Sequence, residues 1–105
     1  MSRNFNNIED LYIKIKNRID SKDSLSYSYQ LDQEGLEKIN RKFGEEAIEV
    51  IIAAFNKQKD DSIKHKKELI GEIADIIYHL TVLMINQNLT FEDILKELNI
   101  RNDKK

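Results

Sequence analysis

Two pairs of acidic residues have the spacing that could bring carboxylates together for metal-assisted chemistry. Glu46 and Glu49 form the first pair, and Glu72 and Asp75 form the second. At about 100° per residue, residues three apart lie about 60° from each other around a helix, with Cβ atoms ~5–6 Å apart. Apolar residues follow one turn after each pair, so the carboxylates share a face that points inward. If two such helices are neighbours, the spacing predicts four carboxylates in one partly buried site.

Such a site needs a cation, because buried unpaired charge is costly and carboxylates raise one another's pKa values. The chain offers oxygen ligands, with no Cys and no paired His. Oxygen-only ligands favour Mg²⁺ or Mn²⁺ over Zn²⁺, and Mg²⁺ usually leaves positions for water and substrate phosphate. The acids therefore fit phosphoanhydride chemistry at a bound divalent ion.

A surface interpretation stays open on spacing alone. Glu45, Glu46 and Glu49 could form a solvated helix face that pairs with Arg41 and Lys42 at i, i+4 spacing. Acid-rich helices are common, and surface ion pairs need no function.

Helices must position these acids, and the recurrence of apolar residues at intervals of three and four predicts four of them. The expected ranges are about 6–19, 32–57, 63–87 and a last helix that ends near residue 99. Asp32 is the expected cap of the second helix and Thr90 of the fourth. Asp20–Ser26 and Asn56–Asp61 are polar breaks. The short second break predicts that the two long helices pack as an antiparallel hairpin.

Composition limits the class of protein. The chain has 105 residues, no Pro, no Cys and three Gly, with 40% hydrophobic and 34% charged residues. Few turn formers indicate an all-α fold, in a single domain with a core at about 6–99 and a charged tail at 101–105. Without Cys there are no disulfides, thiolate metal sites or Cys nucleophiles. The net charge of −2 gives no excess of positive charge for a nucleic acid or an anionic membrane.

The sequence has no pattern of a membrane anchor or a secretory leader. Met1–Asp10 contains acidic residues and lacks an apolar stretch of roughly 7–15 residues. The apolar run Val50–Phe55 is far shorter than the ~20 residues that span a bilayer. We therefore expect a cytoplasmic protein.

The two long helices are apolar around much of their circumference, which one hairpin with two short flanking helices cannot cover. The apolar residues are Ile48, Val50, Ile51, Ile52 and Phe55 on one helix and Ile76, Ile77, Leu80, Val82, Leu83 and Ile85 on the other. We expect a two-fold homodimer in which the hairpins form a helical bundle.

The order of residues around the acids resembles one known family, the phosphoribosyl-ATP pyrophosphatases of histidine biosynthesis. Two segments carry the resemblance: Lys42-Phe43-Gly44-Glu45-Glu46-Ala47-Ile48-Glu49-Val50 and Glu72-Ile73-Ala74-Asp75-Ile76-Ile77-Tyr78-His79. It extends upstream through Ser26-Tyr27-Ser28 and covers most of residues 8–98. The two acid pairs also resemble the ExxE…ExxD motif of the wider MazG-like group of all-α nucleoside triphosphate pyrophosphohydrolases.

The resemblance implies hydrolysis of 1-(5-phosphoribosyl)-ATP to 1-(5-phosphoribosyl)-AMP and pyrophosphate, with Mg²⁺ or Mn²⁺ as cofactor. It also implies a dimer with sites near the subunit interface, and we expect a stand-alone domain. Carried over by position, Glu46, Glu49, Glu72 and Asp75 would hold the ion. Glu45 completes the expected catalytic set, as a neighbour able to orient water or bind a second ion.

Cations and hydroxyls near the acids are the expected substrate contacts. Lys38 and Lys42 lie one turn apart, and Arg41 is a third cation that could reach phosphate oxygens. Lys42 is the favoured residue, and its alternative role is an ion pair with the neighbouring acids. Tyr27 and Ser28 fall where the family has Ser-Tyr-Thr, a segment that could close over substrate, although Tyr27 could instead be a packed aromatic.

Two further residues have open interpretations. His79 lies one turn after Asp75, where it could hydrogen-bond that carboxylate or be an ordinary core histidine. Gly44 is interpreted as a packing position.

The chain departs from the family pattern between the acid pairs. Twenty-two residues separate Glu49 from Glu72, several more than the resemblance leads us to expect, with the excess in Lys57–Lys67. This basic segment is expected to form a longer turn or an extra helical turn at the hairpin tip. Two other functions stay open: a MazG-like pyrophosphohydrolase of other nucleoside triphosphates, and a non-catalytic helical dimer.

Overall fold

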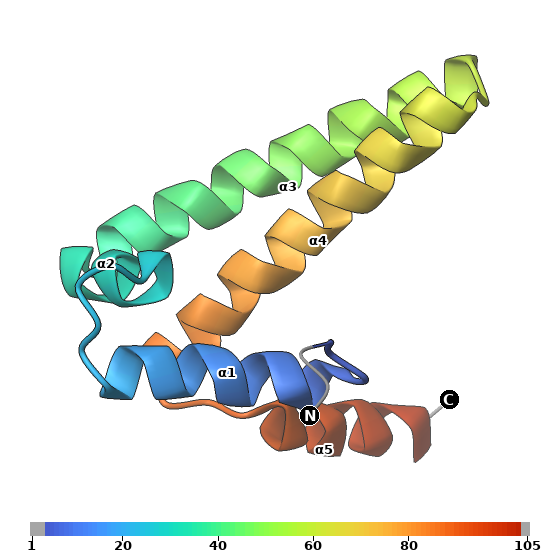
Figure 1. Cartoon of the computed structure of the whole chain (residues 1–105). Helices are drawn as coiled ribbons and strands as arrows, with labels where there is room; N and C mark the ends of the chain where they lie inside the picture. The colour runs from blue at the N-terminus through green and yellow to red at the C-terminus, as the bar shows by residue number, and fades with distance from the viewer. Residues whose placement is uncertain (1–3, 104–105) are drawn as a thin grey trace.

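Five helices make up the fold of residues 4–103. The structure, a computed structural model, describes residues 4–103. The helices are α1 Ile8–Asp20, α2 Tyr27–Glu34, α3 Leu36–Lys59, α4 Ile63–Asn86 and α5 Phe91–Asp103 (Figure 1). Across residues 4–103 there is no strand, and none of the helices is both long and apolar enough to cross a membrane. The predicted all-α class is confirmed, while the dimeric assembly stays a prediction.

The two longest helices, α3 and α4, form the predicted antiparallel hairpin. Each has 24 residues. They converge at a short turn and spread apart toward the opposite end, where α1 and α2 lie (Figure 1). The Ser62 hydroxyl caps α4 by accepting a hydrogen bond from the backbone N–H of His65 at 3.3 Å. The basic segment at the tip is therefore mostly helical, because only residues 60–62 separate the two helices.

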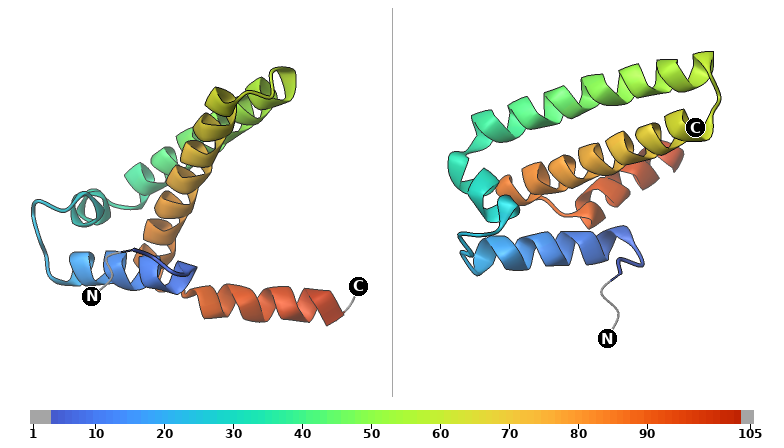
Figure 2. Two further views of the ribbon diagram at one scale, coloured as in Figure 1. Left: turned by 45° about the vertical axis from the view of Figure 1, so that its right-hand side comes forward. Right: turned by 45° about the horizontal axis from the view of Figure 1, so that its top comes forward.

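The buried core lies at the wide end of the hairpin. Its central side chains are Ile15 of α1, Leu31 of α2, Ile39 of α3, and Val82 and Ile85 of α4. Figure 2 shows α1 and α2 gathered at this end while the other end of the hairpin projects beyond them. Four helices thus fix the angle at which the two arms leave the core.

The helix α2 is absent from the sequence prediction, which starts one helix at Asp32 and continues it through Gly35. That prediction is wrong because Gly35 adopts φ 95° and ψ 175°, a backbone conformation that is essentially restricted to glycine. Asp32 lies inside α2, where its carboxylate accepts a hydrogen bond from Asn86 Nδ2 at 3.1 Å instead of capping a helix. Ser26 is the cap, since its hydroxyl accepts from the N–H of Tyr29.

The last helix, α5, leads away from α2 and the wide end of the hairpin (Figure 2). Tyr12 of α1 holds the start of α5 against the core. The Tyr12 hydroxyl donates a hydrogen bond to the Leu89 carbonyl oxygen at 2.9 Å, and the Tyr12 ring meets the Phe91 ring edge-on. Thr90 caps α5 as predicted, with its hydroxyl accepting from the N–H of Asp93 at 3.2 Å.

The end of α5 differs from the prediction of a helix that stops near residue 99. Residues 101–103 remain helical, and Arg101 Nε donates to Glu97 one turn earlier at 3.2 Å. The expected charged tail is therefore helical as far as Asp103, and Lys104 and Lys105 lie outside the described residues, as do Met1–Arg3.

Candidate functional site

Three of the four expected metal ligands meet between the arms of the hairpin. Glu46 of α3 and Glu72 and Asp75 of α4 each contribute one carboxylate oxygen to a group whose atoms all lie within 4.8 Å of one another. Helical spacing places the α4 pair on one face, and the antiparallel packing of α3 against α4 brings Glu46 opposite. The two acid pairs predict four carboxylates in one site, and the structure brings three of them within this distance.

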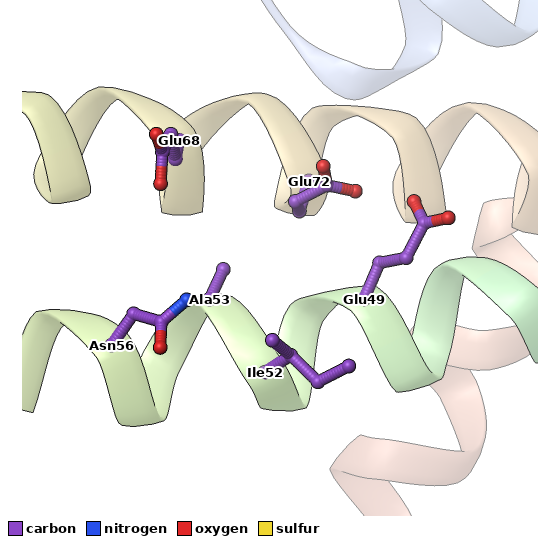
Figure 3. A pocket seen from close by; sticks show the side chains of 6 residues that line it. All are labelled: Glu49, Ile52, Ala53, Asn56, Glu68 and Glu72. Atoms are coloured by element: carbon purple, nitrogen blue, oxygen red, sulfur yellow. The ribbon is translucent and has the colours of Figure 1, made fainter.

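The fourth acid, Glu49, lies one turn along α3. Figure 3 shows its side chain reaching from α3 toward Glu72 on α4. A pocket of about 190 Å³ opens beside these two carboxylates and is lined by Glu49, Ile52, Ala53, Asn56, Glu68 and Glu72. The small side chain of Ala53, which is buried, leaves room between the arms.

Two polar residues of this pocket, Asn56 and Glu68, are missing from the candidate set drawn from the sequence. Glu68 lies one turn before Glu72, and Asn56 lies two turns after Glu49, so both continue the helix faces that carry the acids. Helical periodicity alone could have identified them.

Two carboxylate oxygens of the site have no hydrogen-bond partner among residues 4–103. Oxygen Oε2 of Glu46 and oxygen Oε2 of Glu72 are buried without a hydrogen-bond partner. Burial raises the pKa of Glu46, with added repulsion from Glu49 and Asp75. A hydrogen bond shared with the Glu49 carboxyl, followed by burial and repulsion from the other acids, raises the pKa of Glu72 from 4.5 to about 7.

A divalent cation fits this donor set. Orphaned, partly buried carboxylate oxygens from two helices are costly without a positive partner, and hard ions such as Mg²⁺ or Mn²⁺ take oxygen ligands. Glu46, Glu72 and Asp75 would hold the ion, with Glu49 beside them.

The expected cations differ in how close they come to the acids. Lys42 Nζ lies 3.8 Å from Glu45 Oε2, and its charge lowers the pKa of Glu46 against the other influences there. Glu45 is exposed and pairs with Lys42, and it is not part of the three-carboxylate group. Lys38 and Arg41 make no ion pair with any acid in the described part of the chain.

Tyr27 and Ser28 begin α2, which contacts α4 just beyond Asp75. The Ser28 hydroxyl is buried and hydrogen-bonded to the Tyr78 hydroxyl, so in this structure it does not face solvent. The Tyr27 ring stacks on Tyr78 and remains 47% exposed. Its pKa is raised by burial first, then by repulsion from Tyr78 and from acids of α2 and α3.

His79 does not contact the Asp75 carboxylate, which corrects one of the two interpretations from spacing. Its Nδ1 lies 2.9 Å from the Asp75 backbone carbonyl oxygen, and its Nε2 lies 3.1 Å from the Tyr27 hydroxyl. The packing interpretation of Gly44 is also unsupported, because a Cβ atom there would meet nothing within 4 Å.

The fold and the carboxylates together define an all-helical protein with a candidate divalent-cation site between two antiparallel helices. A family model described as phosphoribosyl-ATP pyrophosphohydrolase matches residues 8–102. The chain therefore belongs to the phosphoribosyl-ATP pyrophosphohydrolase family, a family of hydrolases.

Curated relatives agree with this family. A phosphoribosyl-ATP pyrophosphatase of Clostridium novyi (strain NT) is 44% identical over 101 residues, covering 96% of this chain and 86% of the relative. A phosphoribosyl-ATP pyrophosphatase of Leptospira biflexa is 45% identical over 94 residues, covering 90% of this chain and 91% of the relative. The histidine biosynthesis bifunctional protein HisIE of Caldanaerobacter subterraneus is 41% identical over 97 residues, and the match covers 92% of this chain and 44% of that longer protein.

Proposed function

We propose that the chain hydrolyses 1-(5-phosphoribosyl)-ATP between its α and β phosphates, releasing 1-(5-phosphoribosyl)-AMP and pyrophosphate in histidine biosynthesis. The observation that carries the proposal is the group formed by Glu46, Glu72 and Asp75, with two buried oxygens that lack partners. Membership of the family supplies the substrate, since its relatives are named for phosphoribosyl-ATP.

In this proposal the residues of α3 and α4, the two arms of the hairpin, have separate roles in metal binding, phosphate binding and the orientation of water. Glu46, Glu72, Asp75 and the adjacent Glu49 would hold Mg²⁺, with Mn²⁺ as a substitute. When bound, the ion neutralises phosphate charge and lowers the pKa of an attacking water. Lys42 exchanges its contact with Glu45 for a phosphate oxygen, which frees the Glu45 carboxylate to orient water.

A substrate panel tests the reaction. Release of pyrophosphate is measured with phosphoribosyl-ATP and with ordinary nucleoside triphosphates, in the presence of Mg²⁺ and of EDTA. We expect turnover of phosphoribosyl-ATP that EDTA abolishes. Turnover of ordinary triphosphates alone would favour a MazG-like pyrophosphohydrolase, and no turnover of either would favour a non-catalytic helical protein.

Paired substitutions test the carboxylates. Asp75→Asn should abolish most turnover at moderate Mg²⁺ while leaving the circular dichroism of the helices unchanged, because one ligand is lost and the backbone is not. Glu37→Gln is the matched control, since Glu37 is an exposed acid at the start of α3 outside the carboxylate group. Wild-type turnover in Asp75→Asn would remove the metal assignment.

We further propose that two chains associate through the hairpin. Large apolar side chains stay exposed along α3, and Phe55 among them is 68% exposed. A group of exposed apolar side chains of this kind is unusual for a protein that acts as a monomer. The exposed residues of this face include Ile48, Ile51, Ile52 and Phe55. A second copy would cover them by forming a bundle of four long helices.

The oligomeric state is measured by light scattering after size-exclusion chromatography. Phe55→Glu should shift the protein from dimer toward monomer, because a charge would be buried in the interface. Lys64→Glu is the control, since it places the same side chain at an exposed polar position on the other arm and changes the net charge by even more. A monomeric wild-type chain would refute the assembly.

A further inference from the structure

His79 is a buried side chain that the proposed hydrolysis leaves without a role, although both of its ring nitrogens have partners. Nδ1 lies 2.9 Å from the Asp75 carbonyl oxygen and Nε2 lies 3.1 Å from the Tyr27 hydroxyl. The residue is 7% exposed, and its ring meets those of Tyr27 and Tyr78 edge-on. The imidazole therefore joins α2 to the backbone of a candidate metal ligand on α4.

The partners of the ring decide which nitrogen carries the proton. A backbone carbonyl oxygen only accepts hydrogen bonds, so Nδ1 of His79 must donate to Asp75. In a neutral ring Nε2 then has a lone pair, and the Tyr27 hydroxyl donates to it. The Tyr27 hydrogen is used in this bond, so Tyr27 faces any further partner as a hydrogen-bond acceptor.

The position of Tyr27 makes a further partner available. Its side chain is about half exposed, and its ring lies against Tyr78 and His79, which follow Asp75 by three and four residues on α4. An acceptor there suits a group that carries a hydrogen. Ionised phosphate oxygens are acceptors themselves, whereas the sugar hydroxyls of a nucleotide can donate.

We propose that His79 is a positioning residue that holds the Tyr27 hydroxyl as an acceptor for a sugar hydroxyl of the nucleotide substrate. This inference rests on the proposed function for its substrate. It extends that function by assigning Tyr27 to the sugar and by leaving the phosphates to the cations and the metal site.

The tautomer can be tested without any turnover. Long-range ¹H–¹⁵N NMR at mildly alkaline pH, where a free imidazole is neutral, reports which ring nitrogen of His79 is protonated. We expect the Nδ1–H form, and Tyr27→Phe should shift the Nε2 resonance while leaving Nδ1 largely unchanged. An Nε2–H tautomer would overturn the inference whether or not the chain hydrolyses phosphoribosyl-ATP.

Kinetics then separate positioning from a merely structural role. His79→Asn can keep a donor to the Asp75 carbonyl but does not reach Tyr27, whereas His79→Gln can place an acceptor near the Nε2 position. We expect His79→Asn and Tyr27→Phe each to raise KM about tenfold with little change in kcat, and the double variant to be no worse. His79→Gln should restore KM toward the wild-type value.

Two comparisons make the result specific. Tyr29→Phe removes a hydroxyl from the same helix that makes no hydrogen bond within residues 4–103, so its KM should stay at the wild-type value. Inorganic triphosphate, which lacks a sugar, should inhibit wild type and Tyr27→Phe equally. The inference is overturned if kcat falls without a change in KM, if the two single variants are additive, if Tyr29→Phe has the same effect, or if triphosphate binding weakens.

Discussion

Acidification should weaken binding of Mg²⁺ to the carboxylate group, and the structure sets the size of the effect. The pKa of Glu72 is raised to about 7 in the metal-free chain, so an ion must displace a proton from this residue below that pH. For a single site, the apparent dissociation constant should rise about tenfold between about pH 8 and about pH 6. The raised pKa of Glu46 acts in the same direction.

The same shift predicts how the metal-free fold responds to pH. Because the folded pKa of Glu72 lies above the ordinary value of 4.5, the folded chain binds more protons than the unfolded chain between these pH values. The contribution of Glu72 to stability is therefore complete below about pH 4.5 and is lost as the pH rises through about 7. Saturating Mg²⁺ should oppose this loss, because ion binding stabilises the ionised form.

Isothermal titration calorimetry in buffers of different ionisation enthalpy measures both the affinity and the protons released. At pH 7 we expect Glu72 to release about half a proton per bound ion, since it is half protonated at its pKa. Glu72→Gln should bind Mg²⁺ more weakly and lose this part of the pH dependence. A dissociation constant that is the same at both pH values, or a Glu72→Gln variant with the full pH dependence, would refute the reasoning.

Three other substitutions have separate expected outcomes. Gly35→Ala should lower the free energy of unfolding, measured in urea, by about 1–3 kcal/mol, because φ 95° is strained for alanine. Gly44→Ala lies within a helix and should raise the free energy of unfolding by roughly 1 kcal/mol. Equal effects of the two substitutions would contradict this reasoning. Ile39→Ala should cost about 2–5 kcal/mol, measured from the same transition, since Ile39 is fully buried in the core. Lys42→Ala should raise KM roughly 10- to 100-fold. The control, Lys57→Ala, loses the ion pair with Asp61 and should leave KM unchanged. An unaltered KM in Lys42→Ala would make Lys42 a surface ion-pair residue.

Most of the fold could be predicted from helix periodicity. The prediction failed at α2, where the apolar pattern is weak and a glycine ends the helix. The hairpin and its carboxylate pairs follow from apolar residues and acids that recur at three and four, and Thr90 followed by Asp93 marks a helix start through simple capping chemistry. The helix α2 was missed because its eight residues carry a weak apolar pattern and because a positive φ at Gly35 cannot be read from the letter Gly alone.

The candidate site shows the same limit at the level of single atoms. Spacing placed Glu46 opposite Glu72 and Asp75, since Cβ directions on a helix are fixed by its geometry. Spacing did not reveal that His79 bonds the Asp75 carbonyl, because that choice depends on a side-chain rotamer and on α2 arriving with Tyr27. The role of each residue in turnover stays a prediction.

The place of the core at one end of the hairpin has a consequence for how this protein can change over evolution. Its stability rests on side chains such as Ile39 and Val82, whereas the acids lie farther along arms that bury little beyond Ala53. Substitutions of polar residues along the arms can therefore reshape substrate preference while this buried core stays intact. An ion held by both arms would also act as a removable crosslink, so backbone amides of α3 and α4 near the acids should exchange hydrogen more slowly as the ion binds.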